Sequence, residues 1–176
     1  MRNVVAAVLV VLLVVTVAGC KKPRRGATIP SSGPGTAGGG WGEGIPLSEM
    51  PDSMIFGEIT DPEMKAIFED IHFDYDDPSI KDSERGILEN IAAWLNSNPA
   101  VVIQVEGHCD ERGSNEYNLA LGDRRALSVR GYLVDLGVGP DMVYTISYGE
   151  ERPVDTGHDE SAWWQNRRGH FMVAPE

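Results

Sequence analysis

The chain has 176 residues, which is enough for one domain with or without a tail. Its 27 acidic residues outnumber its 15 basic residues and give a formal net charge of −12. A nucleic-acid-binding protein needs a basic surface that neutralises phosphates, so this balance argues against that class and no nucleic-acid partner is expected. The two cysteines, Cys20 and Cys109, are too few for a disulfide framework.

The first 26 residues differ in charge from the rest, because they contain five basic residues and no acidic one. Arg2 is followed by an apolar run of 12 residues, Val4 to Val15. That run is too short to cross a bilayer, which takes about 20 helical residues. A charged start, a short apolar run and small residues after it are typical of a secretory signal, so residues 1–19 are predicted to be a signal peptide.

The signal ends in Val17-Ala18-Gly19-Cys20, which resembles the bacterial lipobox. In that motif the cysteine thiolate receives diacylglycerol, and the cysteine becomes the mature N-terminus. We expect diacylglycerol and an N-linked acyl chain on Cys20, which would hold the protein in a membrane because each buried methylene contributes about 0.8 kcal/mol. An ordinary signal peptide and a transmembrane anchor are the alternatives. Lys21 replaces the Asp that retains many Gram-negative lipoproteins in the inner membrane, which favours the outer membrane.

A segment rich in small residues follows. Residues 26–46 include eight Gly, three Pro and two Ser. Such a segment buries too little surface to offset the entropy lost on ordering. Residues 20–65 are therefore predicted to be a lipidated N-terminus and a flexible tether, on which a domain facing the periplasm searches for its partner.

Residues 66–176 are predicted to form one α+β domain. The expected elements are a strand at 67–73, a helix capped by Asp82 or Ser83 that ends before Pro99, a strand at 101–108, a helix at 116–136, and strands at 143–148 and 169–173. Apolar and mostly polar residues alternate along 101–108, so helices should cover one face of the sheet only. The prediction is a two-layer sandwich, βαβαβ plus a further strand, with helices on one face of a mixed sheet.

The second helix carries the most informative pattern. Its expected buried stripe repeats at three and four residues and consists of Leu119, Gly122, Ala126, Val129, Leu133 and Leu136. Asn118, Leu121 and Arg125 lie within about 60° of one another at the border of this stripe, whereas Arg124 lies roughly 100° further round. Arg125 should therefore be partly buried and Arg124 should face solvent.

A polar loop, residues 107–114, precedes this helix and contains Asp110. A half-buried arginine needs a partner, and Asp110 is the nearest candidate for Arg125 by topology. A fixed cation beside a fixed anion matches an amino-acid zwitterion, because Arg pairs with a carboxylate and Asp with an ammonium. The alternative is a structural Asp110–Arg125 ion pair that orders the loop and binds nothing. Spacing alone leaves both open.

Catalysis and metal binding find little support in the sequence. His108 and Cys109 are adjacent, but neighbours in a strand point to opposite faces. The one cysteine and four scattered histidines of residues 66–176 lack the spacing of metal ligands. The acidic turn at 74–77 lacks the Gly and the Glu that an EF-hand calcium loop requires. We expect no enzymatic activity, no metal and no cofactor other than the lipid on Cys20.

The helix pattern Asn118-x-x-Leu121-x-x-x-Arg125-Ala126-x-x-Val129-x-x-x-Leu133 and several segments around it resemble the OmpA C-terminal-like peptidoglycan-binding domains. The supporting segments are residues 105–108, 110–113, 148–150, 157–160 and 166–168. The resemblance spans about residues 70–173, and the lipobox and tether point to the lipoproteins of that family. Cys109 stands where relatives usually have Ala or Thr.

The resemblance implies non-covalent binding of peptidoglycan through the meso-diaminopimelate of its peptide stem. Asp110 and Arg125 match the two residues that grip the amino-acid end of that side chain. Phe73, Asp74, Ser114, Asn118 and Leu121 match neighbouring ligand contacts. The resemblance also implies membership of the Tol system, contact with its periplasmic β-propeller protein, and a part in envelope integrity and cell division. A wall-binding lipoprotein outside that system is the alternative.

Overall fold

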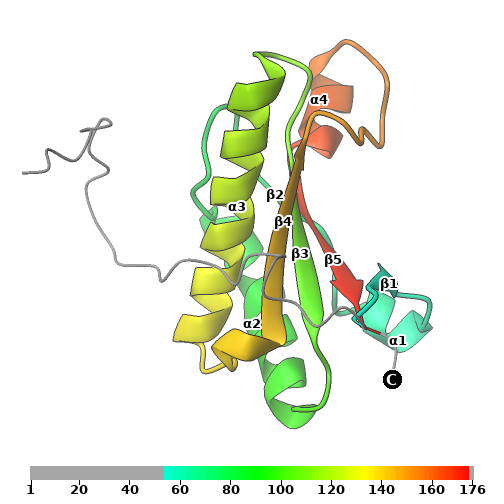
Figure 1. Cartoon of the computed structure of the whole chain (residues 1–176), viewed down its shortest axis with the longest axis vertical. Coiled ribbons are helices and arrows are strands. Elements are labelled where there is room, and N and C mark those ends of the chain that lie inside the picture. The colour runs from blue at the N-terminus through cyan, green and yellow to red at the C-terminus, as the bar shows by residue number, and fades with distance from the viewer. Residues whose placement is uncertain (1–53, 175–176) are drawn as a thin grey trace, which may run out of the picture. The chain divides into compact units, whose positions relative to one another are not determined.

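A computed structural model describes residues 54–174 (Figure 1), and the predicted signal peptide, Cys20 and most of the predicted tether lie outside this part of the chain. The elements are β1 (Gly57–Glu58), α1 (Pro62–Lys65), β2 (Ile71–His72), α2 (Asp82–Ser97), β3 (Ile103–His108), α3 (Asn115–Asp135), the 3-10 helix η2 (Pro140–Met142), β4 (Val143–Gly149), α4 (Glu160–Asn166) and β5 (Arg168–Val173). None of the helices between residues 54 and 174 is long and apolar enough to cross a membrane.

The strands form one mixed sheet in the order β1–β5–β3–β4. β3 runs parallel to β4 and antiparallel to β5. β1 pairs with the end of β5 and β2 with its beginning, both antiparallel. Helices α2 and α3 lie together against one face of the sheet (Figure 1). The predicted α+β fold, a helical layer on a mixed sheet, is confirmed.

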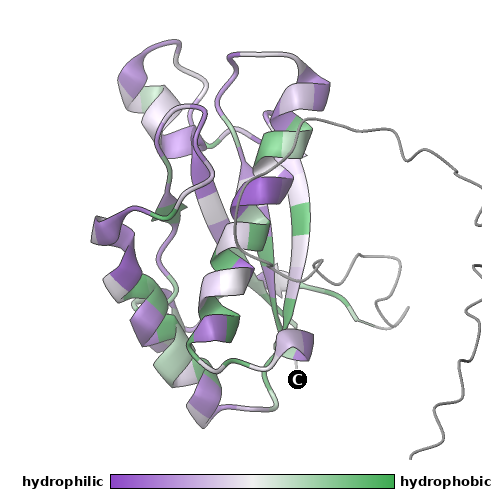
Figure 2. Cartoon of the chain, turned by 90° about the vertical axis from the view of Figure 1, so that its left-hand side faces the viewer, coloured by the Kyte–Doolittle hydropathy of each residue, from purple (hydrophilic) through white to green (hydrophobic). Residues whose placement is uncertain are grey.

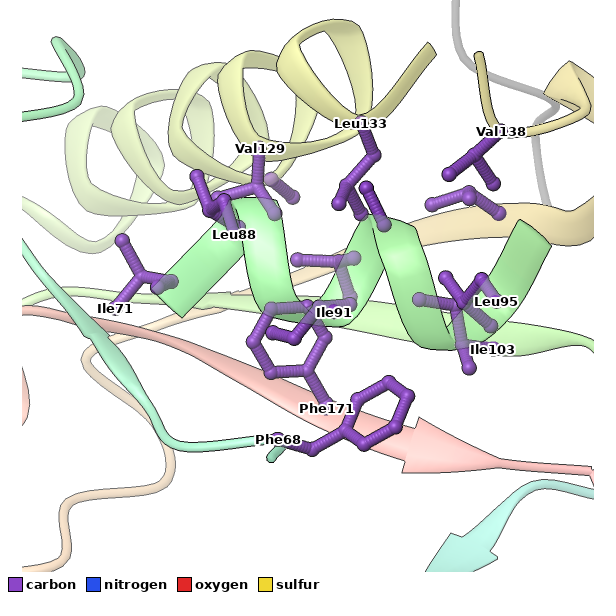
Figure 3. Close-up of a cluster of buried hydrophobic side chains, with 14 of the residues drawn as sticks. Phe68, Ile71, Leu88, Ile91, Leu95, Ile103, Val129, Leu133, Val138 and Phe171 are labelled. Carbon is purple, nitrogen blue, oxygen red and sulfur yellow. The ribbon is translucent and has the colours of Figure 1, made fainter. Parts of the chain in front are cut away.

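The core fills the space between these two layers (Figure 3). Leu88, Ile91 and Leu95 of α2 pack there, and each is fully buried. They follow the helical period, so one side of α2 is apolar and the other faces water. Figure 2 shows this alternation of hydrophobic and hydrophilic residues around the helices.

The folded part begins before residue 66, so the predicted end of the tether was wrong. β1 pairs with β5, and Ile59 after it is 5% exposed and joins the core. A strand of two residues has no alternation that sequence reading could detect. Helix α1 did carry a signal, because Asp61 caps it with bonds to two backbone N–H groups and Pro62 begins it.

Two further boundaries differ from prediction. Only Ile71 and His72 of the expected first strand pair with β5, while Phe68 packs edge to face on Trp94 and Phe171 in the turn before it. The N-cap of α2 is Lys81, whose side chain makes no capping bond, and neither Asp82 nor Ser83 occupies that position. Asp82 and Glu84 instead lie in the first turn, where negative charge stabilises the helix dipole.

The buried stripe of α3 also differs. Leu119 is only partly buried and Leu136 is exposed, whereas Asn118, Leu121 and Arg125 are almost completely buried. The cause is a close approach of α3 to β3, since a Cβ atom on Gly107 would lie 1.8 Å from the carbonyl oxygen of Gly122. Because of this contact, the first half of α3 packs directly against the end of the sheet.

The face of β3 away from α2 and α3 is buried too, although the alternation suggested a solvated polar face. Gln104 and Glu106 are each 5% exposed and His108 is 1% exposed. β3 lies between β5 and β4, so long side chains on both neighbours shield it; His170 on β5 is opposite Glu106. Both ring nitrogens of His170 face carboxylates, Asp70 at 2.7 Å and Glu58 at 3.3 Å.

Candidate functional site

A pocket of about 250 Å³ lies where the loop after β3 meets the first half of α3 and the turn after β2. Four predicted site residues line it: Asp110, Asn118, Leu121 and Arg125. The other lining residues are Tyr75, Asp76, Cys109, Arg112, Gly113 and Tyr117. The structure thus brings Asp110 and Arg125 to one pocket, together with Tyr75 and Tyr117, which sequence reasoning did not single out.

Phe73, Asp74 and Ser114 do not line this pocket but support it. The Phe73 ring is fully buried, with its centroid 5.1 Å from the Arg125 guanidinium carbon. The Asp74 carboxylate lies 3.8 Å from Lys81, and only its backbone carbonyl reaches Arg125. Ser114 is the N-cap of α3 and accepts a hydrogen bond from the Tyr117 N–H.

Arg125 is the largest fully buried side chain of the described residues, at 0% exposure. Its Nη2, Nη1 and Nε atoms donate to the carbonyl oxygens of Asp74, His108 and Asp77 at 2.8, 2.8 and 3.1 Å. Nη1 also lies 3.5 Å from the Cys109 sulfur. These bonds use four of the five guanidinium N–H groups and leave one on Nη2. Burial lowers the pKa of Arg125, but the guanidinium remains charged.

The predicted ion pair between Asp110 and Arg125 is absent. Within residues 54–174 no carboxylate lies within 4.0 Å of the Arg125 guanidinium nitrogens. Backbone carbonyls of the turn after β2 and of His108 at the end of β3 occupy the donors of this arginine instead, because α3 lies close to the end of the sheet. Among residues 54–174, Arg125 is thus a buried cation with no ion-pair partner within 4.0 Å, and it borders a pocket. Arg124 is exposed, as predicted.

Asp110, 3% exposed, is held by two other arginines. Arg112 donates from Nη2 to Oδ2 at 2.7 Å and from Nε to Oδ1 at 3.1 Å, and its backbone N–H also reaches Oδ1. Arg167 donates to Oδ2 at 3.2 Å. Burial raises the pKa of Asp110, but the hydrogen bonds from Arg112 and Arg167 outweigh it, and the pKa lies below its usual range.

The Arg112 guanidinium lies between two aromatic rings. Its central carbon is 4.0 Å from the centroid of Tyr75 and 4.1 Å from that of Trp163 on α4. Glu111, next to it, accepts from the Trp163 indole N–H at 2.9 Å. Trp163 therefore borders the site through its contacts with Arg112 and Glu111, although it does not line the pocket.

Arg167 and Asn118 fix the walls of the pocket. Arg167 is 4% exposed and also binds the Phe73 carbonyl and Glu160, so it joins β2, α4 and Asp110. The Asn118 amide donates to Glu150 at 2.6 Å and to two carbonyls of the Asp110 loop. The pairing of Arg167 with Asp110 joins residues 57 positions apart, which no periodicity could reveal.

The chemistry of the neighbouring residues is not that of a nucleophile. Burial raises the pKa of Cys109 to about 11, so its thiol stays protonated at neutral pH. The thiol donates to the Asn118 carbonyl, while His108 lies on the other side of the sheet near Glu106. In the acidic turn, Asp76 accepts from Tyr117 and Asp77 from the Ser79 N–H. Between residues 54 and 174, no group of three or more His, Cys, Asp or Glu residues is placed to hold a metal ion.

A signature helix laid against a mixed sheet, with a charged pocket at the sheet end, defines an OmpA-like domain. The sequence profile of the OmpA family matches residues 72–167. The chain therefore belongs to the OmpA family, and within it to the group named peptidoglycan-associated lipoproteins.

Relatives of that name support the narrower assignment. The protein from Haemophilus influenzae is 43% identical over 116 residues, which cover 66% of this chain and 76% of the relative. The protein from Mesorhizobium japonicum is 41% identical over 170 residues, which cover 95% and 89%. The crystal structure of the peptidoglycan-associated lipoprotein from Burkholderia pseudomallei superposes with a TM-score of 0.62 at 42% identity, over 65% of this chain and 97% of that one. The C-terminal domain of Helicobacter pylori MotB shares the fold, with a TM-score of 0.58 at 22% identity over 61% of this chain and 85% of that one.

Proposed function

We propose that this domain binds peptidoglycan non-covalently, without catalysis, through the amino-acid end of meso-diaminopimelate in the peptide stem. The observation that carries the proposal is Arg125, a fully buried cation with no carboxylate of the described residues within 4.0 Å, in the same pocket as Asp110. Burying an uncompensated charge is costly, so a ligand carboxylate there would be strongly favoured. Asp110 supplies the matching anion for the ligand ammonium.

Two properties of the site support this ligand over a simple anion or cation. The pocket volume of about 250 Å³ suits a group the size of an amino acid rather than a large cofactor. The charged lining residues comprise two acids, Asp76 and Asp110, and two bases, Arg112 and Arg125. A zwitterion can pair with both the acidic and the basic side chains, whereas a polyanion would be repelled by a chain with a net charge of −12. The names of the relatives from H. influenzae and M. japonicum point to the same polymer.

The test is co-sedimentation of the full chain, purified in non-ionic detergent, with insoluble cell walls. We expect the chain to sediment with diaminopimelate-type wall and to remain mostly in solution with lysine-type wall. The two side chains differ by the carboxylate that Arg125 would bind. Equal sedimentation with both would contradict recognition of the zwitterion, and no sedimentation with either would contradict wall binding itself.

We further propose that Cys20 carries diacylglycerol and an N-linked acyl chain, and that the protein ties the outer membrane to the wall from its periplasmic side. The support is the lipobox and the lipoprotein name of the relatives. Replacing Cys20 with Ala should abolish acylation and outer-membrane fractionation. A variant that still fractionates normally and carries acyl chains would contradict the anchor.

Membership of the Tol system, with its periplasmic β-propeller protein as partner, is proposed on the resemblance of the whole domain to peptidoglycan-associated lipoproteins. Affinity purification of the intact chain from its own envelope should recover a β-propeller protein. Wall binding without such a partner would instead favour an OmpA-like lipoprotein outside that system.

A further inference from the structure

The acceptor capacity of Asp110 is full in this structure. An ionised carboxylate offers about four lone-pair sites. Asp110 accepts four hydrogen bonds: from the Arg112 backbone N–H and Nε on Oδ1, and from Arg112 Nη2 and Arg167 Nη1 on Oδ2. A ligand ammonium can therefore reach Asp110 only if one of these donors leaves.

The Arg112 side chain is the donor that can leave. The Arg167 side chain is 4% exposed and is fixed by bonds to the Phe73 carbonyl and Glu160. The Arg112 side chain is 29% exposed, lines the pocket and supplies two of the four bonds. Its departure would free one site on each oxygen of Asp110, and an ammonium group with three N–H donors can occupy both.

A second carboxylate partner for Arg112 lies beside the pocket. The Tyr75 and Trp163 rings hold the guanidinium from both sides, at 4.0 and 4.1 Å. Glu160 Oε2 lies 3.8 Å from Arg112 Nη2. A small movement between the rings would exchange Asp110 for Glu160, and cation–π contact would continue throughout.

The exchange favours one kind of ligand on electrostatic grounds. Three guanidinium groups surround this end of the pocket: Arg112 and Arg167 on Asp110, and Arg125 across from it. A lone ammonium, such as that of lysine, would displace Arg112 and add a further positive charge without compensating any. An ammonium with an adjacent carboxylate would bring a countercharge for Arg125. A resident competitor of this kind raises selectivity by weakening the wrong ligand.

We propose that Arg112 is a specificity-determining residue, a resident counter-ion that yields Asp110 only to an ammonium accompanied by a carboxylate. The proposal rests on the proposed binding of diaminopimelate but concerns selectivity rather than binding as such. It predicts that removing the Arg112 charge opens Asp110 to simple ammonium groups.

The experiment compares Arg112→Gln with wild type in co-sedimentation of the full chain with diaminopimelate-type and lysine-type walls. We expect Arg112→Gln to gain affinity for lysine-type wall, so that the ratio of the affinity for diaminopimelate-type wall to that for lysine-type wall falls about tenfold, the effect of one charged hydrogen bond. Arg152→Gln is the matched control, because Arg152 is also an arginine stacked on a tyrosine, 3.7 Å from the centroid of Tyr148, but is exposed and does not line the pocket. Its ratio should not change.

Two outcomes would overturn the proposal. Loss of binding to both wall types would make Arg112 a direct ligand contact, and an unchanged ratio would make it a plain loop-ordering ion pair. If Arg112→Gln fails to melt cooperatively, Arg112→Lys takes its place. Lysine keeps the charge but cannot bind both carboxylate oxygens in the fork geometry. The ratio of its two wall affinities should lie between that of wild type and that expected for Arg112→Gln. Wild-type chain that binds neither wall would instead defeat the proposed function, a result distinct from either of these.

Discussion

Helix α3 buries two arginines, five residues apart, and they sit in two contrasting regions. Arg130 is 7% exposed, and its Nε and Nη2 donate to the carbonyls of Val143 and Pro140, both at 3.0 Å. Arg125 is held in the same manner by carbonyls of Asp74, Asp77 and His108. Only Arg125 borders the pocket that contains Asp110.

Arg130 and Arg125 together separate a structural role of a buried arginine from a role in binding. Hydrogen bonds to backbone carbonyls let a helix bury a guanidinium, and at Arg130 they connect α3 to the beginning of β4. Burial of an arginine is therefore not by itself a sign of a ligand site. What distinguishes the Arg125 end is free volume and a carboxylate within the same pocket.

The variants Arg125→Gln and Arg130→Gln test most directly whether only Arg125 contributes to binding. Both changes remove hydrogen bonds from a charged donor, so both should lower the free energy of unfolding, by about 1.5–3 kcal/mol for each bond that is not replaced. Only Arg125→Gln should also weaken binding to diaminopimelate-type wall, tenfold to hundredfold on the same scale. Urea unfolding and wall co-sedimentation measure the two effects separately. Equal loss of wall binding in folded Arg130→Gln would show that α3 stability, not the pocket cation, governs binding.

A substitution at the close contact between α3 and β3 should displace Arg125 from its position in the pocket. In Gly107→Ala the new Cβ atom would lie 1.8 Å from the Gly122 carbonyl oxygen, so backbone must shift. We expect a loss of about 1–3 kcal/mol in the free energy of unfolding, typical of overpacking, and weaker wall binding because α3 moves away from Asp110. Gly86→Ala, in α2 with no atom within 4 Å of its Cβ, is the control and should stabilise by about 0.5–1 kcal/mol. A Gly107→Ala variant as stable as wild type would refute this close contact.

The pocket region around Asp110 and Arg125 and the region around Arg130 should also differ in how their contributions to stability depend on pH. The folded-state pKa of Asp110 is lowered, so its carboxylate contributes stability above its unfolded pKa of about 4, and this contribution disappears as pH falls through the folded pKa. The difference in unfolding free energy between wild type and Asp110→Asn should thus be constant near neutral pH and shrink below about pH 4. The acceptors of Arg130 are carbonyls, so the deficit of Arg130→Gln should not follow this titration. Urea titrations from pH 7 to pH 3 would show whether the stability deficits of Asp110→Asn and Arg130→Gln depend differently on pH.

The same contrast explains how far sequence reasoning could go. The period of α2 and the spacing of Asn118, Leu121 and Arg125 are local, and they predicted the layers of the fold and three residues of the pocket. The partners of Asp110 and Arg125 were wrong because they come from distant segments: Arg167 lies 57 residues from Asp110, and Asp74 lies 51 residues before Arg125. Carbonyl acceptors leave no trace in composition at all. Arg112, two residues from Asp110, was within reach of local reasoning.

The smallest effect is expected at Arg124, the neighbour of Arg125. It is exposed, its guanidinium carbon is 6.0 Å from the Tyr117 ring centroid, and within residues 54–174 it forms no ion pair shorter than 4.0 Å. Arg124→Gln removes the same charge as Arg125→Gln, one position away, and so controls for the net charge of the chain. Surface substitutions of this kind usually change stability by no more than about 0.5 kcal/mol, and we expect wall binding to change by about twofold or less.

The double variant Arg124→Gln/Arg125→Gln should bind wall as weakly as Arg125→Gln alone, because only one of the two side chains can reach a ligand in the pocket. Adjacent residues on a helix point about 100° apart, so long-range attraction is the one property that the pair shares. Raising the salt concentration screens that attraction for an exposed charge much more than for a buried one. If wall binding depended on Arg124 as strongly as on Arg125, and this dependence vanished in high salt, the wall would be held by surface charge rather than by a ligand in the pocket.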